Sequence, residues 1–186
     1  MADMLLIGGG MANTFLKAKG CEIGDSLYEE GKVDIAGELI TKANQRGLKF
    51  LLPTDVVIAD RFAADATHKV VAYNEVPQGW RIMDIGPESI AAFRQALEGA
   101  VTIVWNGTLG VAEMPAFAEG TNAVIEILVE RTRNGATTII GGGDSAAAVD
   151  LAGASEQMTH VSTGGGASLE FLEGHVLPGV AALQEK

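Results

Sequence analysis

Three glycine triplets constrain the fold of this chain more than any other feature. They are Gly8-Gly9-Gly10, Gly141-Gly142-Gly143 and Gly164-Gly165-Gly166, and each follows a short apolar or β-branched run. A strand, then glycines, then a helix N-terminus exposes backbone N–H groups at the positive end of a helix dipole, where an anion is favoured. Glycine also serves ordinary tight turns, so one such loop is weak evidence. Three of them predict a phosphate-rich ligand at one edge of a sheet.

Strand and helix patterns alternate along almost the whole chain, which predicts an α/β fold. We expect a three-layer α/β/α, Rossmann-like parallel sheet with helices on both sides, forming a single domain over residues 1–186. The apolar run at residues 101–105 predicts a strand that is buried on both faces. The predicted strands are 4–7, 48–52, 56–59, 69–73, 101–105, 137–140 and 159–162, and the predicted helices are 11–19, 33–45, 87–97, 121–133, 145–151 and 167–172.

The composition argues against several classes of function. With 13 Lys+Arg against 24 Asp+Glu, the formal net charge is −11 and the cations are scattered, so nucleic-acid binding is not expected. No apolar run reaches the ~20 residues of a membrane span, and no signal peptide opens the chain. Cys21 is the one cysteine, which excludes an intrachain disulfide and fits a reducing compartment. We expect a cytoplasmic monomer that does not bind membranes.

Common nucleotide fingerprints are absent or incomplete. Asn13, three residues after the first triplet, stands where the dinucleotide pattern requires glycine or alanine. No acidic residue ends a second strand ~20 residues later. The chain also has no phosphate-binding loop of the G-x-x-x-x-G-K-[ST] type. These departures disfavour a dinucleotide-dependent oxidoreductase and a P-loop nucleotidase.

Two acidic residues near glycine loops have alternative roles. Asp144 and Ser145 could cap the following helix, or Asp144 could hold a magnesium ion that bridges phosphates while Ser145 donates to a phosphate oxygen. Glu113, in the loop after Trp105-Asn106-Gly107, could accept hydrogen bonds from ribose hydroxyls or be a surface glutamate before Pro115. The residues alone leave both pairs of alternatives open.

Several longer motifs occur in a fixed order over essentially the whole chain. They are Ile7-Gly8-Gly9-Gly10-Met11-Ala12-Asn13-Thr14-Phe15, Leu52-Pro53-Thr54-Asp55, Ile58-Ala59-Asp60, Gly86-Pro87-Glu88-Ser89, Val104-Trp105-Asn106-Gly107, Ile140-Gly141-Gly142-Gly143-Asp144-Ser145, His160-Val161-Ser162-Thr163-Gly164-Gly165-Gly166-Ala167-Ser168-Leu169-Glu170 and Leu177-Pro178-Gly179-Val180. Together they resemble the C-terminal, nucleotide-binding domain of phosphoglycerate kinase. The resemblance implies reversible phosphoryl transfer in glycolysis, between 1,3-bisphosphoglycerate and magnesium ADP, which gives 3-phosphoglycerate and ATP.

The resemblance also implies roles for individual residues. Gly8 to Gly10 and the segment around Ile82 would border the adenine, and Glu113 would bind the ribose. Asp144 would hold Mg²⁺ and Ser145 a phosphate oxygen, while the amides of the third triplet would stabilise the phosphoryl group in transfer. The implied nucleotide-binding set is Gly8, Gly9, Gly10, Ile82, Asn106, Gly110, Val111, Glu113, Gly142, Gly143, Asp144 and Ser145, and the implied catalytic set is Gly143, Gly164, Gly165 and Gly166.

The chain departs from the family pattern in two respects. Thr108 and Ala112 replace a proline and a phenylalanine in the loop after Asn106-Gly107, which predicts a looser loop. The family's basic N-terminal domain, which takes 3-phosphoglycerate, has no counterpart, nor does the opening strand and helix of this domain. We therefore expect a domain that is incomplete at its N-terminal edge and, by itself, has no appreciable transfer activity. A nucleotide- or partner-binding module without chemistry is the alternative.

Overall fold

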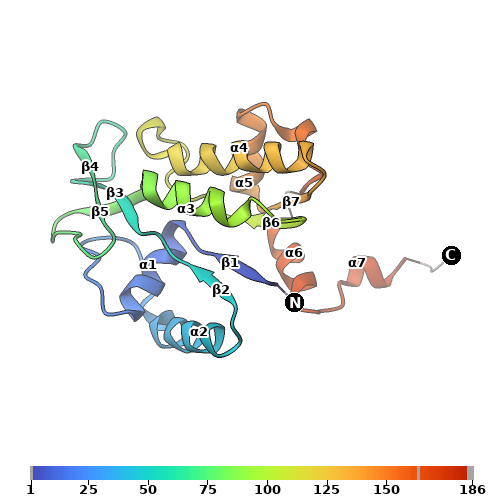
Figure 1. Ribbon diagram of the computed structural model, residues 1–186, viewed down its shortest axis with the longest axis horizontal. Helices are drawn as coiled ribbons and strands as arrows, with labels where there is room; N and C mark the ends of the chain where they lie inside the picture. The colour runs from blue at the N-terminus through green and yellow to red at the C-terminus, as the bar shows by residue number, and fades with distance from the viewer. Residues whose placement is uncertain (1, 163, 184–186) are drawn as a thin grey trace. The chain divides into compact units, whose positions relative to one another are not determined.

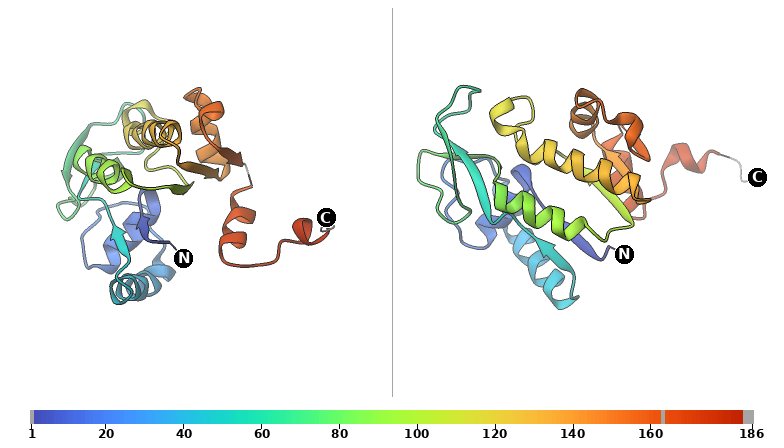
Figure 2. Two further views of the ribbon diagram at one scale, coloured as in Figure 1. Left: turned by 45° about the vertical axis from the view of Figure 1, so that its right-hand side comes forward. Right: turned by 45° about the horizontal axis from the view of Figure 1, so that its top comes forward.

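The computed structural model describes residues 2–162 and 164–183. They form two compact units. Unit 1 comprises the chain up to Gly99 together with Thr108–Ile127, and unit 2 comprises Ala100–Gly107 and the chain from Leu128 onward. Helix α4, Glu119–Arg133, is continuous and contributes residues to both units (Figure 2).

Unit 1 begins with a parallel two-stranded sheet and two helices. Strand β1, Met4–Leu6, pairs with β2, Lys49–Leu51, and helix α1, Gly9–Ala18, packs against α2, Val33–Gln45 (Figure 1). The apolar side chains of α1 face this sheet, because the Phe15 and Phe50 rings lie 5.2 Å apart. The helix at 33–45 has the predicted bounds, and α1 begins two residues earlier than predicted.

The second sheet of unit 1 is antiparallel, which the sequence did not predict. It has the order β4-β3-β5, formed by β3, Asp55–Ala59, β4, His68–Ala72, and β5, Arg81–Ile85. Both of its strand pairs are antiparallel, and loops rather than helices connect its strands. Every residue of β3 is buried, so this strand is the centre of the unit.

Helix α3, Pro87–Leu97, follows this sheet with the predicted bounds. Pro87 occupies the first turn, where its missing N–H costs no hydrogen bond. The buried Asp55 carboxylate accepts hydrogen bonds from the N–H groups of Ser89 at 2.7 Å and Glu88 at 3.0 Å. A side chain from β3 therefore satisfies N–H groups of the first turn of α3.

Unit 2 is built on a parallel sheet of order β6-β7-β8. Its elements in chain order are β6, Thr102–Asn106, the last part of α4, β7, Thr137–Gly141, α5, Gly143–Leu151, β8, His160–Ser162, α6, Gly165–Leu172, and α7, Pro178–Ala181. Helix α5 packs against β7 and β8. The parallel strands with intervening helices confirm the predicted α/β class.

The prediction that residues 101–105 are buried on both faces is wrong. Val101 is 75% exposed and Val104 is 42% exposed, whereas Ile103 and Trp105 are buried. Burial along β6 therefore alternates with period two. Strand β6 is at the end of the three-stranded order, and only one of its faces packs on a core within the described residues.

Candidate nucleotide site at the carboxyl ends of the strands

Three loops of unit 2 meet at the carboxyl edge of the parallel sheet. The register pairs Asn106 with Gly141 and Gly141 with Ser162, so β6, β7 and β8 end at the same level. This alignment brings the residues after each strand together, as expected for ligand loops in a parallel sheet. Strands β6 and β7 are each followed directly by a glycine, Gly107 and Gly142.

A partly buried hydrogen bond joins the loop after β6 to the first turn of α5. The N–H of Gly107, whose φ is +90°, donates to Ser145 Oγ at 2.7 Å. Ser145 has no exposed surface. A β-carbon on Gly142 would lie 3.1 Å from Asn106 Oδ1, so these two segments are also in van der Waals contact. Asn106, Gly142 and Ser145 are therefore neighbours.

The second triplet begins α5 without a side-chain cap. Gly142 is the N-cap residue with φ +95°, and no side chain makes a capping hydrogen bond there. Asp144 is exposed in the first turn. The capping alternative for Asp144 and Ser145 therefore does not describe this helix, and the Asp144 carboxylate remains available to a ligand.

The residues at this helix fit magnesium bound through a nucleotide. Among the described residues, no group of three or more His, Cys, Asp and Glu side chains could hold a metal. Mg²⁺ commonly uses one or two carboxylates together with substrate phosphates and water rather than an all-protein cage. A single exposed carboxylate beside bare amides, as at Asp144, is compatible with that kind of coordination.

The third triplet lies against the second. A β-carbon on Gly165 would come within 2.6 Å of Gly142 Cα, so the close approach of the two loops requires glycine at position 165. Gly164 donates its N–H to Ser162 Oγ at 3.2 Å, and Ser168 Oγ donates to the Gly164 carbonyl at 3.0 Å. The N–H groups of Gly165 and Gly166 are in the first turn of α6 and lack intrahelical acceptors. Thr163 lies outside the described residues.

The first triplet belongs to unit 1 and packs on a different loop. The N–H of Gly9, with φ +59°, donates to the Leu109 carbonyl at 3.1 Å, and a β-carbon on Gly8 would collide with the Leu109 side chain. Gly10 has open space around its Cα. This triplet therefore shapes a packing contact with the loop that follows residue 107.

The other expected residues of unit 1 lie on the same loop or on β5. Val111 donates its N–H to the Met83 carbonyl at 2.9 Å, which attaches the loop to the strand that contains Ile82. Glu113 is exposed, and Ile82 and Gly110 are half-buried. The structure thus gathers the expected residues into two groups, Gly8, Gly9, Gly10, Ile82, Gly110, Val111 and Glu113 in unit 1, and Asn106, Gly142, Gly143, Asp144, Ser145, Gly164, Gly165 and Gly166 in unit 2.

Sequence reasoning missed Asp84, a buried carboxylate on β5 beside these residues. It is 1% exposed and accepts hydrogen bonds from the N–H groups of Gly120 and Ile85, each at 2.8 Å. Burial is the main cause that raises the pKa of Asp84 to about 7; backbone hydrogen bonds, first that of Gly120, lower this pKa, and the nearby charge of Glu119 raises it. The signal in the sequence was an acidic residue inside the apolar run Ile82-Met83-Asp84-Ile85.

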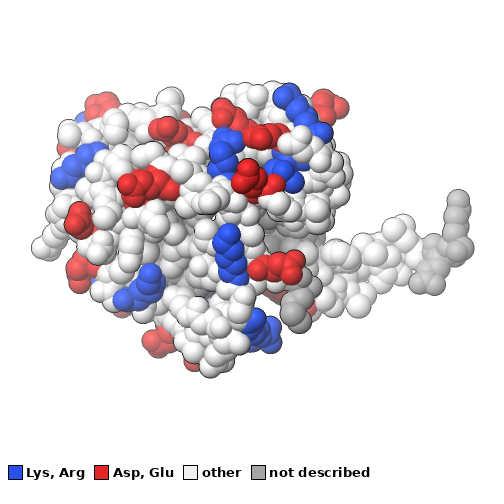
Figure 3. Space-filling model, viewed as in Figure 1, with Lys and Arg blue, Asp and Glu red and all other residues white. Residues whose placement is uncertain are grey.

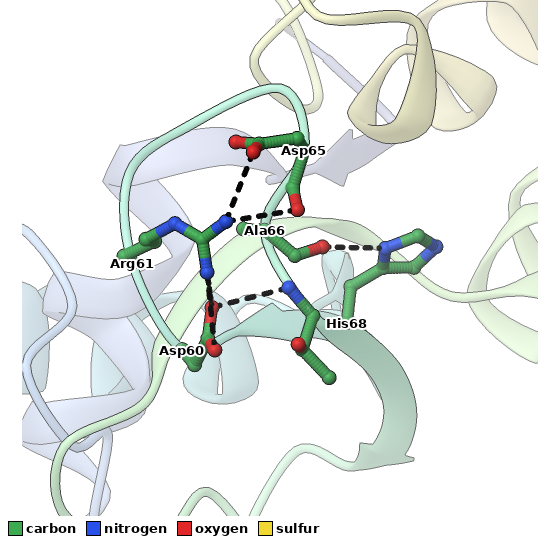
Figure 4. Close-up of polar contacts among 6 residues, drawn as sticks. Asp60, Arg61, Asp65, Ala66 and His68 are labelled. Atoms are coloured by element: carbon green, nitrogen blue, oxygen red, sulfur yellow. Dashed lines mark hydrogen bonds and ion pairs between the residues drawn. The ribbon is translucent and has the colours of Figure 1, made fainter.

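Charged clusters elsewhere in unit 1 have structural partners. In the loop between β3 and β4, Arg61 bridges Asp60 and Asp65 at 3.2 Å each, and Asp60 accepts a hydrogen bond from the Thr67 N–H (Figure 4). His68 Nδ1 contacts the Ala66 carbonyl at 3.1 Å, and its ring lies edge-on to Phe117. These contacts order the loop and leave His68 engaged in packing.

Charge on the surface is mixed in sign. On the face shown in Figure 3, lysine and arginine side chains are interspersed with acidic ones and form no continuous basic stripe. Among the helices that the structure describes, none is both long and apolar enough to cross a membrane.

Comparisons with known proteins show which family the chain is similar to. The family model for phosphoglycerate kinase matches residues 1–175. Phosphoglycerate kinases from Chloroflexus aurantiacus and Synechococcus elongatus are 57% and 56% identical over 183 residues, which is 98% of this chain and 46% of each relative. The chain thus spans about half the length of these relatives.

Solved structures give the same result. The phosphoglycerate kinase of Coxiella burnetii superposes with a TM-score of 0.91 at 43% identity, covering 97% of this chain and 46% of that structure. The enzyme of Pyrococcus horikoshii gives 0.80 at 31% identity, covering 98% and 45%. The chain therefore belongs to the phosphoglycerate kinase family.

Proposed function

We propose that this chain provides the nucleotide side of a reversible phosphoryl transfer between 1,3-bisphosphoglycerate and magnesium ADP, which yields 3-phosphoglycerate and ATP. The observation that carries the proposal is the meeting of three glycine loops at the aligned ends of β6, β7 and β8. Phosphoryl transfer depends mainly on positioning and charge neutralisation. A rigid set of backbone N–H groups supplies both without a covalent intermediate.

The unit 2 loops would bind the phosphates. Asp144 would hold Mg²⁺, which neutralises phosphate charge when it is bound. Ser145 Oγ accepts a hydrogen bond from the N–H of Gly107. Its own hydroxyl hydrogen can therefore point toward a phosphate oxygen and donate to it. The amides of Gly143, Gly164, Gly165 and Gly166 would stabilise the charge on the phosphoryl group in transfer.

The unit 1 group would bind the nucleoside. Gly8 to Gly10 and the backbone at Ile82 would border the adenine, with Gly110 and Val111 beside it, and the exposed Glu113 carboxylate would accept from the ribose hydroxyls. This assignment is supported by the hydrogen bonds that join the first triplet and β5 to one loop through Leu109 and Val111. Asn106, in unit 2, would contact the nucleotide from the end of β6.

Titration calorimetry with the 186-residue chain tests the proposal. We expect saturable binding of ADP that is tighter with Mg²⁺ than with a chelator present, and no comparable heat with NAD. In a coupled assay, we expect no appreciable turnover from this polypeptide, because it spans 46% of its relatives and would contribute only the nucleotide side. Absence of ADP binding, or preference for NAD, would contradict the nucleotide assignment, and turnover near that of a full-length family enzyme would contradict the second expectation.

A further inference from the structure

Asp84 is a buried carboxylate that has no role in the proposed phosphoryl transfer. It is the penultimate residue of β5, lies opposite the apolar Val57 on β3, and is almost fully buried. An ionised carboxylate in such a place is costly unless its oxygens are hydrogen-bonded. In this location, its two oxygens need hydrogen-bond donors.

One carboxylate oxygen connects β5 to the segment 108–120, and the other is bound within β5. Asp84 Oδ2 accepts from the N–H of Gly120, in the first turn of α4, and Oδ1 accepts from the N–H of Ile85, each at 2.8 Å. A β-carbon on either Gly110 or Gly120 would collide with Oδ1. The segment thus approaches the carboxylate from two points 10 residues apart, and both points are glycines.

Other hydrogen bonds hold the same segment on both sides of Asp84. The N–H of Val111 donates to the carbonyl of Met83 at 2.9 Å, and the N–H of Leu109 donates to Thr121 Oγ1 at 3.1 Å. The two ends of segment 108–120 are therefore joined to each other. The Asp84 carboxylate lies where these two ends contact β5.

We propose that Asp84 is a positioning residue that holds segment 108–120, and with it Gly110, Val111 and Glu113, in the conformation that binds the nucleotide. Only the second part of this inference, that the held conformation binds the nucleotide, rests on the proposed function. The anchoring of the segment is independent of any ligand, because each contact that carries it lies within unit 1.

The anchor is linked to protonation. Burial raises the pKa of Asp84 to about 7 in the closed segment, and Glu119, beside Gly120, is the charged neighbour that adds to this effect. Opening the segment would hydrate the carboxyl group and return its pKa toward the ordinary 3.8. Opening therefore releases a proton between these two values, so a rise in pH from about 4 to about 7 favours the open form, and the effect levels off above that.

Two measurements with the whole chain test the inference. Amide hydrogen exchange tests the anchoring of the segment, and calorimetry tests its effect on nucleotide binding. We compare the wild type with Asp84→Asn, Asp84→Ala and the control Asp34→Asn, an exposed residue in the first turn of α2. Between pH 5.5 and 7.5, after correction for intrinsic exchange, we expect protection of residues 109–121 to fall about fivefold or more in the wild type and the control. In Asp84→Asn, which mimics the protonated carboxyl, protection should not change with pH.

The same variants report on the nucleotide. Magnesium ADP affinity should follow the protection of the segment in the wild type and the control, and Asp84→Ala should weaken it at every pH because two buried N–H groups lose their acceptor. If Asp84→Ala does not fold, the Asn variant decides. A wild-type pH profile retained in Asp84→Asn would overturn the inference, whereas wild-type protection that changes as expected without any ADP binding would overturn only the proposed function.

Discussion

Asp144 is the residue on which the metal side of the proposed site depends. It is exposed in the first turn of α5 and caps nothing there. We expect Asp144→Ala to weaken magnesium ADP binding by about tenfold or more, a free-energy change of about 1.4 kcal/mol, while binding of ADP in chelator stays nearly unchanged. Calorimetric titrations with and without Mg²⁺ measure the difference.

Asp150→Ala provides the matched control, because Asp150 is an exposed aspartate near the other end of α5. That variant should bind magnesium ADP as the wild type does. Equal losses for Asp144→Ala in both titrations would show that the residue acts by ordering the helix terminus and not through the metal.

At the scale of elements, the close approach of two loops depends on one glycine. A β-carbon at Gly165 would lie 2.6 Å from Gly142 Cα, whereas one at Gly166 would meet open space. We expect Gly165→Ala to cost about 1–3 kcal/mol of stability, as overpacking typically does, and to weaken magnesium ADP binding by separating the second and third loops. Thermal unfolding and calorimetry of the two Ala variants measure these effects.

Gly166→Ala serves as the comparison because both substitutions put alanine into the first turn of α6. Alanine favours a helix over glycine by up to about 1 kcal/mol, so this variant should unfold at the wild-type temperature or above it. Similar destabilisation in both variants would mean that the contact with Gly142 does not limit the loop.

How far the sequence predicts the elements depends on which signal marks each one. Helix α3 was predicted to the residue because Pro87 fixes its start and Gly99 follows its end. The sequence predicted that all three triplets lie at one edge of one sheet; the second and third do, because parallel strands place their carboxyl ends together, whereas the first follows β1 of another sheet. Strand direction has no comparable local signal, so the antiparallel order β4-β3-β5 and strand β5 itself were missed.

Site residues follow the same division. Loop glycines and Asp144 could be named as candidates from the sequence because their neighbours in sequence are also their neighbours in space. Asp84 could not, because Gly120 and Gly110, which surround its carboxylate, are 36 and 26 positions away along the chain. Ser145 lies between these cases: its place at the α5 N-terminus was predicted, but its hydrogen bond to Gly107 comes from the pairing of β6 with β7.

For the whole molecule, charge limits how an anionic ligand can be bound. The formal net charge is −11, so long-range electrostatics oppose the approach of a nucleotide phosphate. Binding must then rely on groups whose effect is local, namely backbone N–H groups at helix termini and a divalent cation. The proposed phosphate loops at residues 106–108, 141–145 and 164–168 contain no lysine or arginine.

The buried charge of Asp84 should also appear in the pH dependence of global stability. Its pKa is raised from 3.8 to about 7 in the folded state, so the folded state binds more protons than the unfolded state between these values. Its contribution to stability is complete below about pH 4 and is lost as the pH rises through about 7.

Asp84→Asn stays neutral, so its free energy of unfolding relative to the wild type should increase with pH, by at most about 1.4 kcal/mol per pH unit, and level off above pH 7. Urea unfolding from pH 5 to 8 measures this difference, with Asp34→Asn cancelling the general effect of net charge. Parallel stability curves for the wild type and Asp84→Asn would mean that the carboxylate is stabilised in its ionised form by its two N–H donors, and that burial does not control its protonation.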